Sequence, residues 1–416
     1  MALAEQMRIL ILGLSTRAIA ESAVRGGYSI LTLDYFGDRD QKHLVENHSL
    51  MRDFKLAFSA ENLLSCSRHL DFEALVYISN LENHPKAVKE LAKGHTLLGN
   101  TSQTLRKVRR WHTFRSFCHE EGIPFPLTLF CDEPLPKSGH WLRKPLKSGG
   151  GHGIAFWQGE PLDESYLLQE YIDGIHCSAA FVADSQKCVL IGIAEQLIGQ
   201  KEFGGRGFAF CGNILPLALP PHEADSVLDA VKDMATKLTR RFGLRGVNGF
   251  DFLLTRPLQG QGIPYLIEVN PRYTASMELI EWAYGLNVFG LHVRSFQGEL
   301  PSFSLRQQPP QPHFYSKGIV YARRNAMMPE TAEWKKRGRR DIPFTGEQIR
   351  AGHPICTVLA QGVTRQDCWQ NLAAAAEATY QEVEFAHTRK IHPHHRPKLE
   401  TGLGPAARQG FSRIYR

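Results

Sequence analysis

The sequence has no run of 18 or more apolar residues and no basic leader followed by an apolar segment, which argues against a membrane span or a secreted protein. Its eight cysteines include no CxxC pair and no regular spacing, so neither a zinc site nor a disulfide framework is favoured. A charged content of 22% and a hydrophobic content of 43% are typical of soluble globular proteins, and 416 residues suggest two or three domains. We expect a cytoplasmic protein of enzyme size with mostly buried thiols.

Little of the net positive charge lies outside the C-terminal segment, although the formal net charge is +7. Residues 386–416 contain seven Lys or Arg against one acidic residue, a net of +6, which leaves 7 − 6 = +1 for the rest of the chain. The charge therefore gives little support to a nucleic-acid partner. We expect this C-terminal segment to be a basic, disordered tail whose HPHHRPK sequence gives only compositional support to metal binding. The KKRGRR run at 335–340 is more typical of a solvated loop.

The N-terminal residues have the pattern of a β-α-β unit. An apolar run at Met7–Leu14 is followed by helical spacing over Thr16–Arg25 and a second strand pattern at Ser29–Asp34. Strands that alternate with helices indicate a parallel, Rossmann-like sheet. The loop after the first strand lacks GxGxxG, so a dinucleotide site is not favoured. Ser15 and Arg17 in this loop could hold an anionic substrate, or form an ordinary turn and helix N-cap.

The remainder reads as α+β. We expect a basic helix over Leu105–Glu121, then strands and two further helices, Pro221–Phe242 and Thr274–Tyr284. A proline-rich and glutamine-rich break at Pro301–Pro312 suggests a linker or edge loop. We predict four regions: a Rossmann-like domain (1–100), a two-part α+β domain (101–300), a small C-terminal α+β extension (301–385) and the tail (386–416).

A glycine-dense segment follows a strand that ends near Lys144. Glycines let the backbone turn and bring N–H groups close to phosphate oxygens, and a lysine at the strand end adds a cation. The segment is not a Walker A motif, because the order GxxxxGK[ST] is absent. It resembles a phosphate-binding lid, with a flexible hairpin as the alternative. Its candidate contacts are Lys144, Ser148, Gly149, Gly150, Gly151, His152 and Gly153.

Two acidic residues lie on apolar strands close in sequence. If the strands of GVNGFDFLL (246–254) and PYLIEVNPR (264–272) pair as a hairpin, Asp251 and Glu268 can face one cavity, and Asn270 points the same way. Carboxylate and amide oxygens suit Mg²⁺, which completes its shell with water and phosphate. Arg272 continues this face and could stabilise charge on a transferring phosphoryl group. A structural salt bridge is the alternative for that arginine.

Taken in order, the lysine and glycine loop, the strand end QEYIDG (169–174) and the acidic strand pair resemble the ATP-grasp superfamily from about Asn100 to Arg294. The preceding stretch resembles the pre-ATP-grasp domain that accompanies this fold. The resemblance implies that ATP and two Mg²⁺ ions, or Mn²⁺, are bound. It implies a metal set of Asp251, Glu268 and Asn270, catalytic roles for Lys144 and Arg272, and adenine contacts from Gln169, Glu170 and Ile172.

Further segments are similar to a branch of predicted ATP-dependent carboxylate-amine ligases: ENHPKAV (82–88), LLGN (97–100), GNILPL (212–217) and DIPFTGEQIRAGHPICTVLA (341–360). The resemblance implies that a carboxylate attacks the γ-phosphate of ATP, and that an amine captures the acylphosphate as an amide. It also links the chain to cofactor or small-metabolite biosynthesis.

The sequence departs from this family in two places. Relatives often carry a second lysine before the GIP turn, where this chain offers Lys107 or Arg110 for the α-phosphate. Relatives also place a Glu after the adenine strand for the ribose, and no such residue is present, so ribose recognition is unassigned. Arg206, in a glycine-rich loop, could clamp a substrate carboxylate or belong to a plain turn.

We expect small-molecule carboxylate and amine substrates, no membrane association and no nucleic-acid partner, and leave a homodimer open. Two alternatives to the ligase are a carboxylase or kinase on the same fold and a non-catalytic ATP-binding protein.

Overall fold

The computed structural model describes residues 7–255, 261–308 and 313–391. Most of the predicted basic tail lies outside these residues. Six of the eight cysteines are buried, which confirms the expectation for most of the thiols. None of the helices in the described ranges is long and apolar enough to cross a bilayer.

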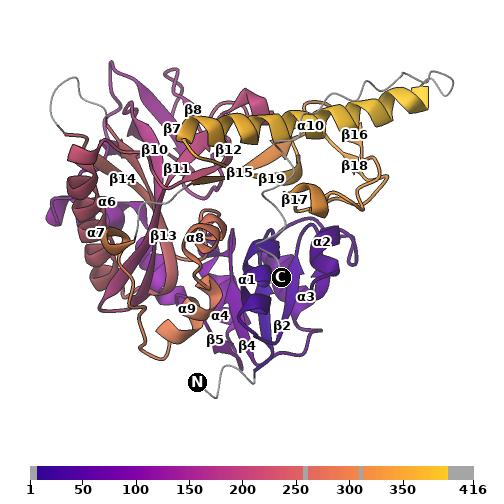
Figure 1. The fold of residues 1–416 in the computed structure, drawn as a ribbon. Helices are drawn as coiled ribbons and strands as arrows, with labels where there is room; N and C mark the ends of the chain where they lie inside the picture. Colours follow the sequence, from indigo (N-terminus) through magenta and orange to yellow (C-terminus); the bar gives the residue numbers. More distant parts are fainter. Residues whose placement is uncertain (1–6, 256–260, 309–312, 392–416) are drawn as a thin grey trace.

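The N-terminal domain is a parallel sheet covered by helices (Figure 1). Its strands, in the spatial order β3-β2-β1-β4-β5, are β1 (Ile9–Leu12), β2 (Ile30–Asp34), β3 (Glu46–Ser49), β4 (Ala74–Tyr77) and β5 (Thr96–Leu97). Its helices are α1 (Arg17–Arg25), α2 (Arg39–Lys42), α3 (Ala60–Ser67) and α4 (Pro85–Leu91). Every residue of β1 and β4 is buried, as expected where helices cover both faces of a sheet. The predicted Rossmann-like organisation is confirmed.

The helix predicted over 105–121 is instead two helices, α5 (Ser102–Val108) and α6 (Trp111–Glu120). Arg110 adopts extended backbone angles (φ −87°, ψ 102°) and separates them. The prediction of one helix was wrong because the basic run has no Gly or Pro to mark the break. The break turns the neighbouring Arg109 toward the interior, where its side chain finds hydrogen-bond acceptors.

Two antiparallel sheets follow. The small sheet contains β6 (Thr128–Leu129), β7 (Trp141–Pro145), β8 (Ala155–Phe156) and β9 (Tyr166–Glu170). The large sheet has the order β14-β13-β10-β11-β12-β15-β19-β17. Its strands are β10 (Ile175–Asp184), β11 (Cys188–Ile198), β12 (Phe210–Leu215), β13 (Arg245–Leu254), β14 (Pro264–Asn270), β15 (Phe314–Tyr321), β17 (Arg339–Arg340) and β19 (Pro354–Gly362). The large sheet thus takes strands from both sides of residue 301, and the predicted domain boundaries stay a prediction.

Helices cover both faces of the large sheet. The amphipathic α7 (Pro221–Phe242) buries one side, at Val227, Val231, Met234, Ala235, Leu238, Thr239 and Phe242. It packs into a core with alternate residues of β10, among them Phe181. The opposite face carries α8 (Met277–Tyr284) and α9 (Val288–Ser295), which share a core with α1. A long helix, α10 (Arg365–Ile391), runs beside β15 and β19, and the antiparallel pair of β16 (Ala326–Met327) and β18 (Gln348–Ile349) lies near it (Figure 1).

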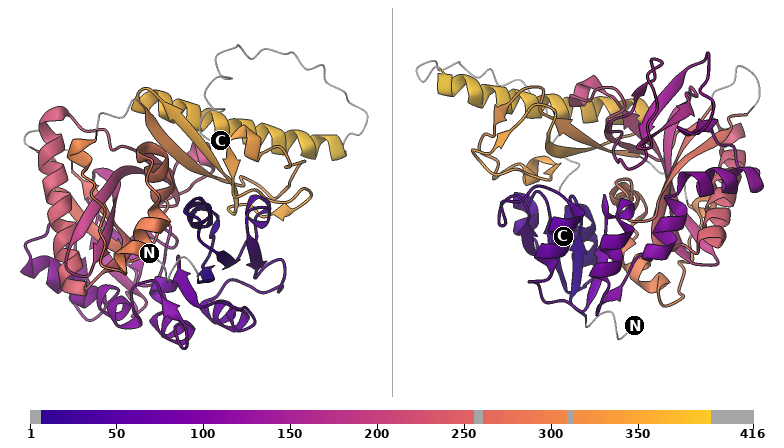
Figure 2. Two further views of the ribbon diagram at one scale, coloured as in Figure 1. Left: turned by 60° about the horizontal axis from the view of Figure 1, so that its bottom comes forward. Right: turned by 180° about the vertical axis from the view of Figure 1, so that it is seen from behind.

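The C-terminal strands and their loops sit against the N-terminal domain, as the views in Figure 2 show. Asp40 on α2 accepts hydrogen bonds from the backbone N–H groups of Asp341 and Ile342. The predicted solvated loop at 335–340 is wrong for its last two residues, because Arg339 and Arg340 are buried. The Arg339 guanidinium forms an ion pair with Glu382 of α10, which compensates its buried charge. This partner lies 43 residues away and could not be identified from the sequence.

Two buried polar residues join the N-terminal domain to the large sheet. Asn100 donates from its amide to the backbone oxygen of Pro271, over 3.0 Å, and accepts from the backbone N–H of Arg245, also over 3.0 Å. On α9, His292 Nδ1 accepts from the backbone N–H of Val247, and Nε2 lies 3.0 Å from the backbone oxygen of Leu98. This pattern fixes a neutral imidazole with its proton on Nε2.

Candidate active site

A cavity of about 870 Å³ lies where the small sheet, the large sheet and the N-terminal domain meet. Most of the residues singled out from the sequence line it: Ser15, Arg17, Lys144, Ser148, Gly149, Gly150, Gly151, His152, Gly153, Gln169, Glu170, Ile172, Asp251, Glu268, Asn270 and Arg272. Three others, Lys107, Arg110 and Arg206, are exposed and do not line it. The structure therefore brings together elements that lie far apart in the sequence.

The acidic strand pair forms as the hairpin hypothesis required. Asp251 on β13 lies directly opposite Glu268 on β14, and Asn270 is two residues further along β14, on the same face. The Asp251 carboxylate accepts hydrogen bonds from Gln196 (3.0 Å) and Asn270 (3.2 Å). Burial, and then the nearby Glu268 charge, raise the pKa of Asp251 to about 8. Without a cation, Asp251 therefore holds its proton near neutral pH, and a bound cation would favour the charged form of the pair.

Arg272 is held in place by Glu82, a residue of the N-terminal domain that sequence reasoning quoted in ENHPKAV but gave no role. Arg272 Nε donates to Glu82 Oε1 over 2.8 Å, and an NH group of the same guanidinium donates to Asn270 Oδ1 over 3.2 Å. Burial alone would raise the pKa of Glu82, but the Arg272 guanidinium outweighs it, and the pKa lies below its ordinary value. The salt bridge considered as the alternative for Arg272 is thus present, and it fixes the guanidinium beside the acidic strand pair.

Arg109, rather than Lys107 or Arg110, reaches the cavity from the basic helical region. Its Nε donates to Asn83 Oδ1 over 2.9 Å and its NH1 donates to the backbone oxygen of Val269 over 3.3 Å. The same NH1 lies 3.7 Å from Glu268 Oε2. The two residues suggested for the α-phosphate are exposed and do not line the cavity, and their role stays a prediction. Had the sequence predicted that the helix ends at Val108, Arg109 would have been a candidate for this site.

Lys144, at the end of β7, is buried beneath the glycine loop. Its Nζ donates to Gln169 Oε1 over 3.0 Å, and Gln169 in turn donates to Thr128 over 3.1 Å. Burial lowers the pKa of Lys144. A desolvated ammonium with one neutral partner is well suited to an incoming anion.

The glycine loop docks on the segment before β12. The backbone N–H of Phe210 donates to the oxygen of Gly150 over 3.0 Å, and the Asn83 amide lies 3.4 Å from the oxygen of Ser148. Gly151 has φ +79°, and a Cβ placed there would lie 1.8 Å from the backbone oxygen of Phe208. Only glycine fits this contact. The loop therefore closes over the cavity by backbone contacts.

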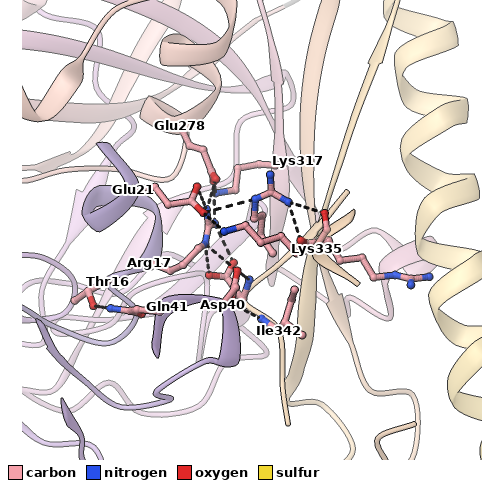
Figure 3. A network of polar contacts seen from close by, with 12 residues as sticks. Thr16, Arg17, Glu21, Asp40, Gln41, Glu278, Lys317, Lys335 and Ile342 are labelled. Carbon is pink, nitrogen blue, oxygen red and sulfur yellow. Dashed lines mark hydrogen bonds and ion pairs between the residues drawn. The ribbon is translucent and has the colours of Figure 1, made fainter. Parts of the chain in front are cut away.

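Arg17, at the start of α1, is surrounded by carboxylates (Figure 3). Four of them lie within 4.0 Å of its guanidinium: Glu21, Asp40, Glu278 and Asp341. Arg17 is 1% exposed, and Lys317 of β15 pairs with Glu278 in turn. This network connects the N-terminal domain, α8 and the C-terminal strands. Protein carboxylates accept hydrogen bonds from all three nitrogens of the guanidinium, which supports a structural function, and the substrate contact suggested for Arg17 stays a prediction.

The end of β9 forms one wall of the cavity. The backbone N–H groups of Glu170 and Tyr171 donate to the backbone oxygens of Leu127 and His140. Ile172 and His176 line the cavity beyond them. Burial, followed by the positive charge of Lys144, lowers the pKa of His176. A neutral imidazole therefore stands on β10 near neutral pH, at the position where the sequence offered no ribose ligand.

Residues 109–276 match a family model described as an ATP-grasp domain. An uncharacterized protein of Methanocaldococcus jannaschii is 21% identical over 408 residues, which cover 92% of this chain and 94% of that protein. An L-amino acid ligase from Bacillus licheniformis superposes with a TM-score of 0.64 at 15% identity, covering 90% of this chain and 98% of the ligase. The biotin carboxylase domain of Hydrogenobacter thermophilus 2-oxoglutarate carboxylase, solved as a dimer with MgADP, ADP and bicarbonate, gives 0.66 at 15% identity, covering 91% and 90%. The predicted fold is confirmed.

Proposed function

We propose, on the premise of the ATP-grasp domain that residues 109–276 match, that the chain is an ATP- and Mg²⁺-dependent ligase that joins a carboxylate to an amine. One observation supports this most directly: Asp251 and Glu268 lie opposite each other in a cavity that also holds Lys144 and Arg272. Carboxylates that could bind a metal cation and positively charged side chains that could bind phosphate therefore line the same cavity. The homodimer stays open, and the biosynthetic setting stays a prediction.

The acidic strand pair fits a divalent cation. Asp251 and Glu268 offer carboxylate oxygens, and the Asn270 amide stands beside them. Within the described ranges no group of three or more His, Cys, Asp or Glu side chains has metal-binding geometry, so the remaining ligands would come from ATP phosphates and water. When bound, Mg²⁺ neutralises charge on the phosphates and aligns them for transfer.

The chain's other residues would bind and orient the reactants. Lys144 and the backbone of the docked glycine loop would hold the phosphates, and Arg109 would add a second cation near Glu268. Arg272, already oriented by Glu82, would stabilise charge on the transferring phosphoryl group. Ile172 and neighbouring backbone would contact adenine, and His176 stands where a ribose hydroxyl could be bound.

The proposed reaction requires no protein nucleophile, because positioning and electrostatics supply the rate. A substrate carboxylate oxygen attacks the γ-phosphorus, the bond to the β-phosphate oxygen breaks, and ADP leaves with an acylphosphate as the other product. An amine nitrogen then attacks the acyl carbon, the bond to phosphate breaks, and the phosphate takes up the proton that the nitrogen loses. Closure of the glycine loop would keep water from the acylphosphate.

The test is release of ADP from the pure protein with ATP, Mg²⁺ and pooled carboxylates and amines. Glu268→Gln keeps the size of the side chain and removes its charge, and we expect a loss of roughly 100-fold or more in kcat/KM. Glu299→Ala, at an exposed residue outside the cavity, serves as the control. Unchanged turnover in Glu268→Gln would refute the proposal.

A carboxylase is the second candidate, because one structural neighbour was solved with bicarbonate bound. In that case ADP release would depend on bicarbonate, and labelled bicarbonate carbon would appear in the product. Amide formation in bicarbonate-free buffer would exclude it. A non-catalytic ATP-binding protein would bind nucleotide without ADP release under any pool.

A further inference from the structure

The cavity extends well past the acidic strand pair. Its floor crosses the large sheet from Asp251 on β13 to Asn213 on β12 and Lys317 on β15. With strands spaced by about 4.8 Å, these two residues stand roughly 14 and 19 Å from Asp251 along the sheet. A nucleotide that runs from Ile172 to the acidic pair leaves this end of the cavity free. Ser15 and Thr357 complete its walls.

Lys317 supplies a buried cation at this end. It is 5% exposed, and Glu278 is the carboxylate that its ammonium contacts among the described residues (Figure 3). An ammonium group has three donors, so two are left for a ligand. Arg17, the other cation here, has its donors taken by the carboxylates around it. Lys317 is therefore the group that would meet an anionic group of a ligand.

Asn213 supplies the complementary acceptor. Its amide nitrogen contacts the backbone oxygen of Glu195 over 3.3 Å and Ser178 Oγ over 3.5 Å, whereas its buried Oδ1 has no hydrogen-bond partner in the described part of the chain. Asn213 is 1% exposed and pairs directly with Lys317 across β12 and β15. A buried acceptor without a donor costs about 1–3 kcal/mol, which a ligand N–H would recover.

We propose that this end of the cavity binds the amine substrate, and that this substrate is an α-amino acid, with its carboxylate on Lys317 and its nitrogen on Asn213 Oδ1. The inference rests on the proposed ligase function and specifies the amine substrate of that reaction. Asn213 lies one strand closer to Asp251 than Lys317 does, so the nitrogen points toward the reacting acylphosphate. Asn213 is also neutral: an amide oxygen accepts from an unprotonated amine, whereas a carboxylate would hold it as the non-nucleophilic ammonium.

The chemistry follows the second step above. The amino nitrogen, after losing the proton that makes it an ammonium ion to solvent, attacks the acyl carbon of the acylphosphate. A carbon–nitrogen bond forms, the carbon–oxygen bond to phosphate breaks, and phosphate leaves with the second proton. The product is an N-acyl amino acid whose free carboxylate remains on Lys317.

The test measures thermal shifts of the full chain with Mg²⁺ and a non-hydrolysable ATP analogue, to which pools of the twenty standard L-amino acids are added. We expect a concentration-dependent rise in Tm with at least one amino acid, since a ligand of the native state stabilises by mass action. Its amide and its des-amino acid should bind roughly tenfold or more weakly, because each lacks one charged or polar contact. No response to any amino acid, or equal binding of the des-amino acid, overturns the proposal.

Two variants localise the effect. Lys317→Met and Asn213→Ala should each lose the amino-acid response and keep the shift caused by the ATP analogue, whereas Lys336→Met, at an exposed lysine of the C-terminal extension, should change neither. If Lys317→Met does not fold, Asn213→Ala decides. Wild-type amino-acid affinity in Asn213→Ala overturns the proposal. Failure of the ATP analogue itself to bind counts against the ligase function instead.

Discussion

Acidification should weaken the junction between the N-terminal domain and the large sheet through His292. Burial lowers the pKa of this histidine to about 4. In its neutral form the ring accepts a hydrogen bond from the Val247 N–H and donates one to the Leu98 backbone oxygen. In the unfolded chain its pKa returns to about 6.5. Because the folded pKa is the lower one, the stabilisation is complete above pH 6.5 and is lost as the pH falls toward 4.

The size of the effect follows from the two pKa values. A difference of about 2.5 units is worth about 3 kcal/mol in the free energy of unfolding, of which about 2 kcal/mol is lost between pH 7 and pH 5. Gly246 makes this close approach feasible, since a Cβ there would lie 2.5 Å from His292 Nδ1. Any residue larger than glycine at position 246 would clash with the imidazole ring in this position.

Urea unfolding at pH 7, 6 and 5 measures this dependence, with wild type and His292→Phe compared at each pH. Carboxylates and other histidines titrate in both proteins, so the difference between them isolates His292. We expect the His292→Phe variant to be less stable at pH 7, because it leaves two buried backbone groups unpaired, but to lose about 2 kcal/mol less on acidification to pH 5. His222→Phe, at a side chain that is 75% exposed, is the control. Parallel pH curves for wild type and His292→Phe would refute the reasoning.

Three further changes test the site. Gly151→Ala should undock the glycine loop and raise KM for ATP by roughly tenfold or more, whereas Gly149→Ala, which meets no atom within 4 Å, should not. Glu82→Gln leaves the Arg272 charge buried and unpaired, so Tm should fall by an amount equivalent to about 3–5 kcal/mol and kcat should drop, with ATP affinity retained in calorimetry. Arg109→Met should weaken ATP binding, and Lys107→Met should leave it unchanged; the reverse result would restore the original interpretation.

The sequence predicted best where local pattern and chemistry coincide. Asp251 and Glu268 could be paired in advance because alternation along a strand sets which side chains share a face, and one hairpin brings them together. The glycine loop was recognisable from composition alone. In both places the information lies within a few residues of the feature.

The missed features depend on contacts between distant segments. Glu82 acquires its function only because the N-terminal domain docks beside Arg272, a residue 190 positions away. From the sequence, Arg17 could bind an anionic ligand, but in the structure Glu278 and Asp341, which are distant in sequence, form ion pairs with it. Arg109 could not be told from its basic neighbours because its acceptors, Asn83 and the backbone oxygen of Val269, lie in distant segments of the chain. Contacts between side chains of different domains cannot be predicted from the local periodicity of helices and strands.

If Arg272 acts on the transferring phosphoryl group as proposed, its contact with Glu82 would make domain assembly a condition for that step. A chain whose N-terminal domain has not yet docked could already bring Lys144 and Asp251 together, because those residues belong to the two antiparallel sheets. Its Arg272 would lack the carboxylate that orients it. On the proposed mechanism, such a partly assembled molecule would bind ATP without hydrolysing it, and the interface would limit futile hydrolysis while the chain is being made.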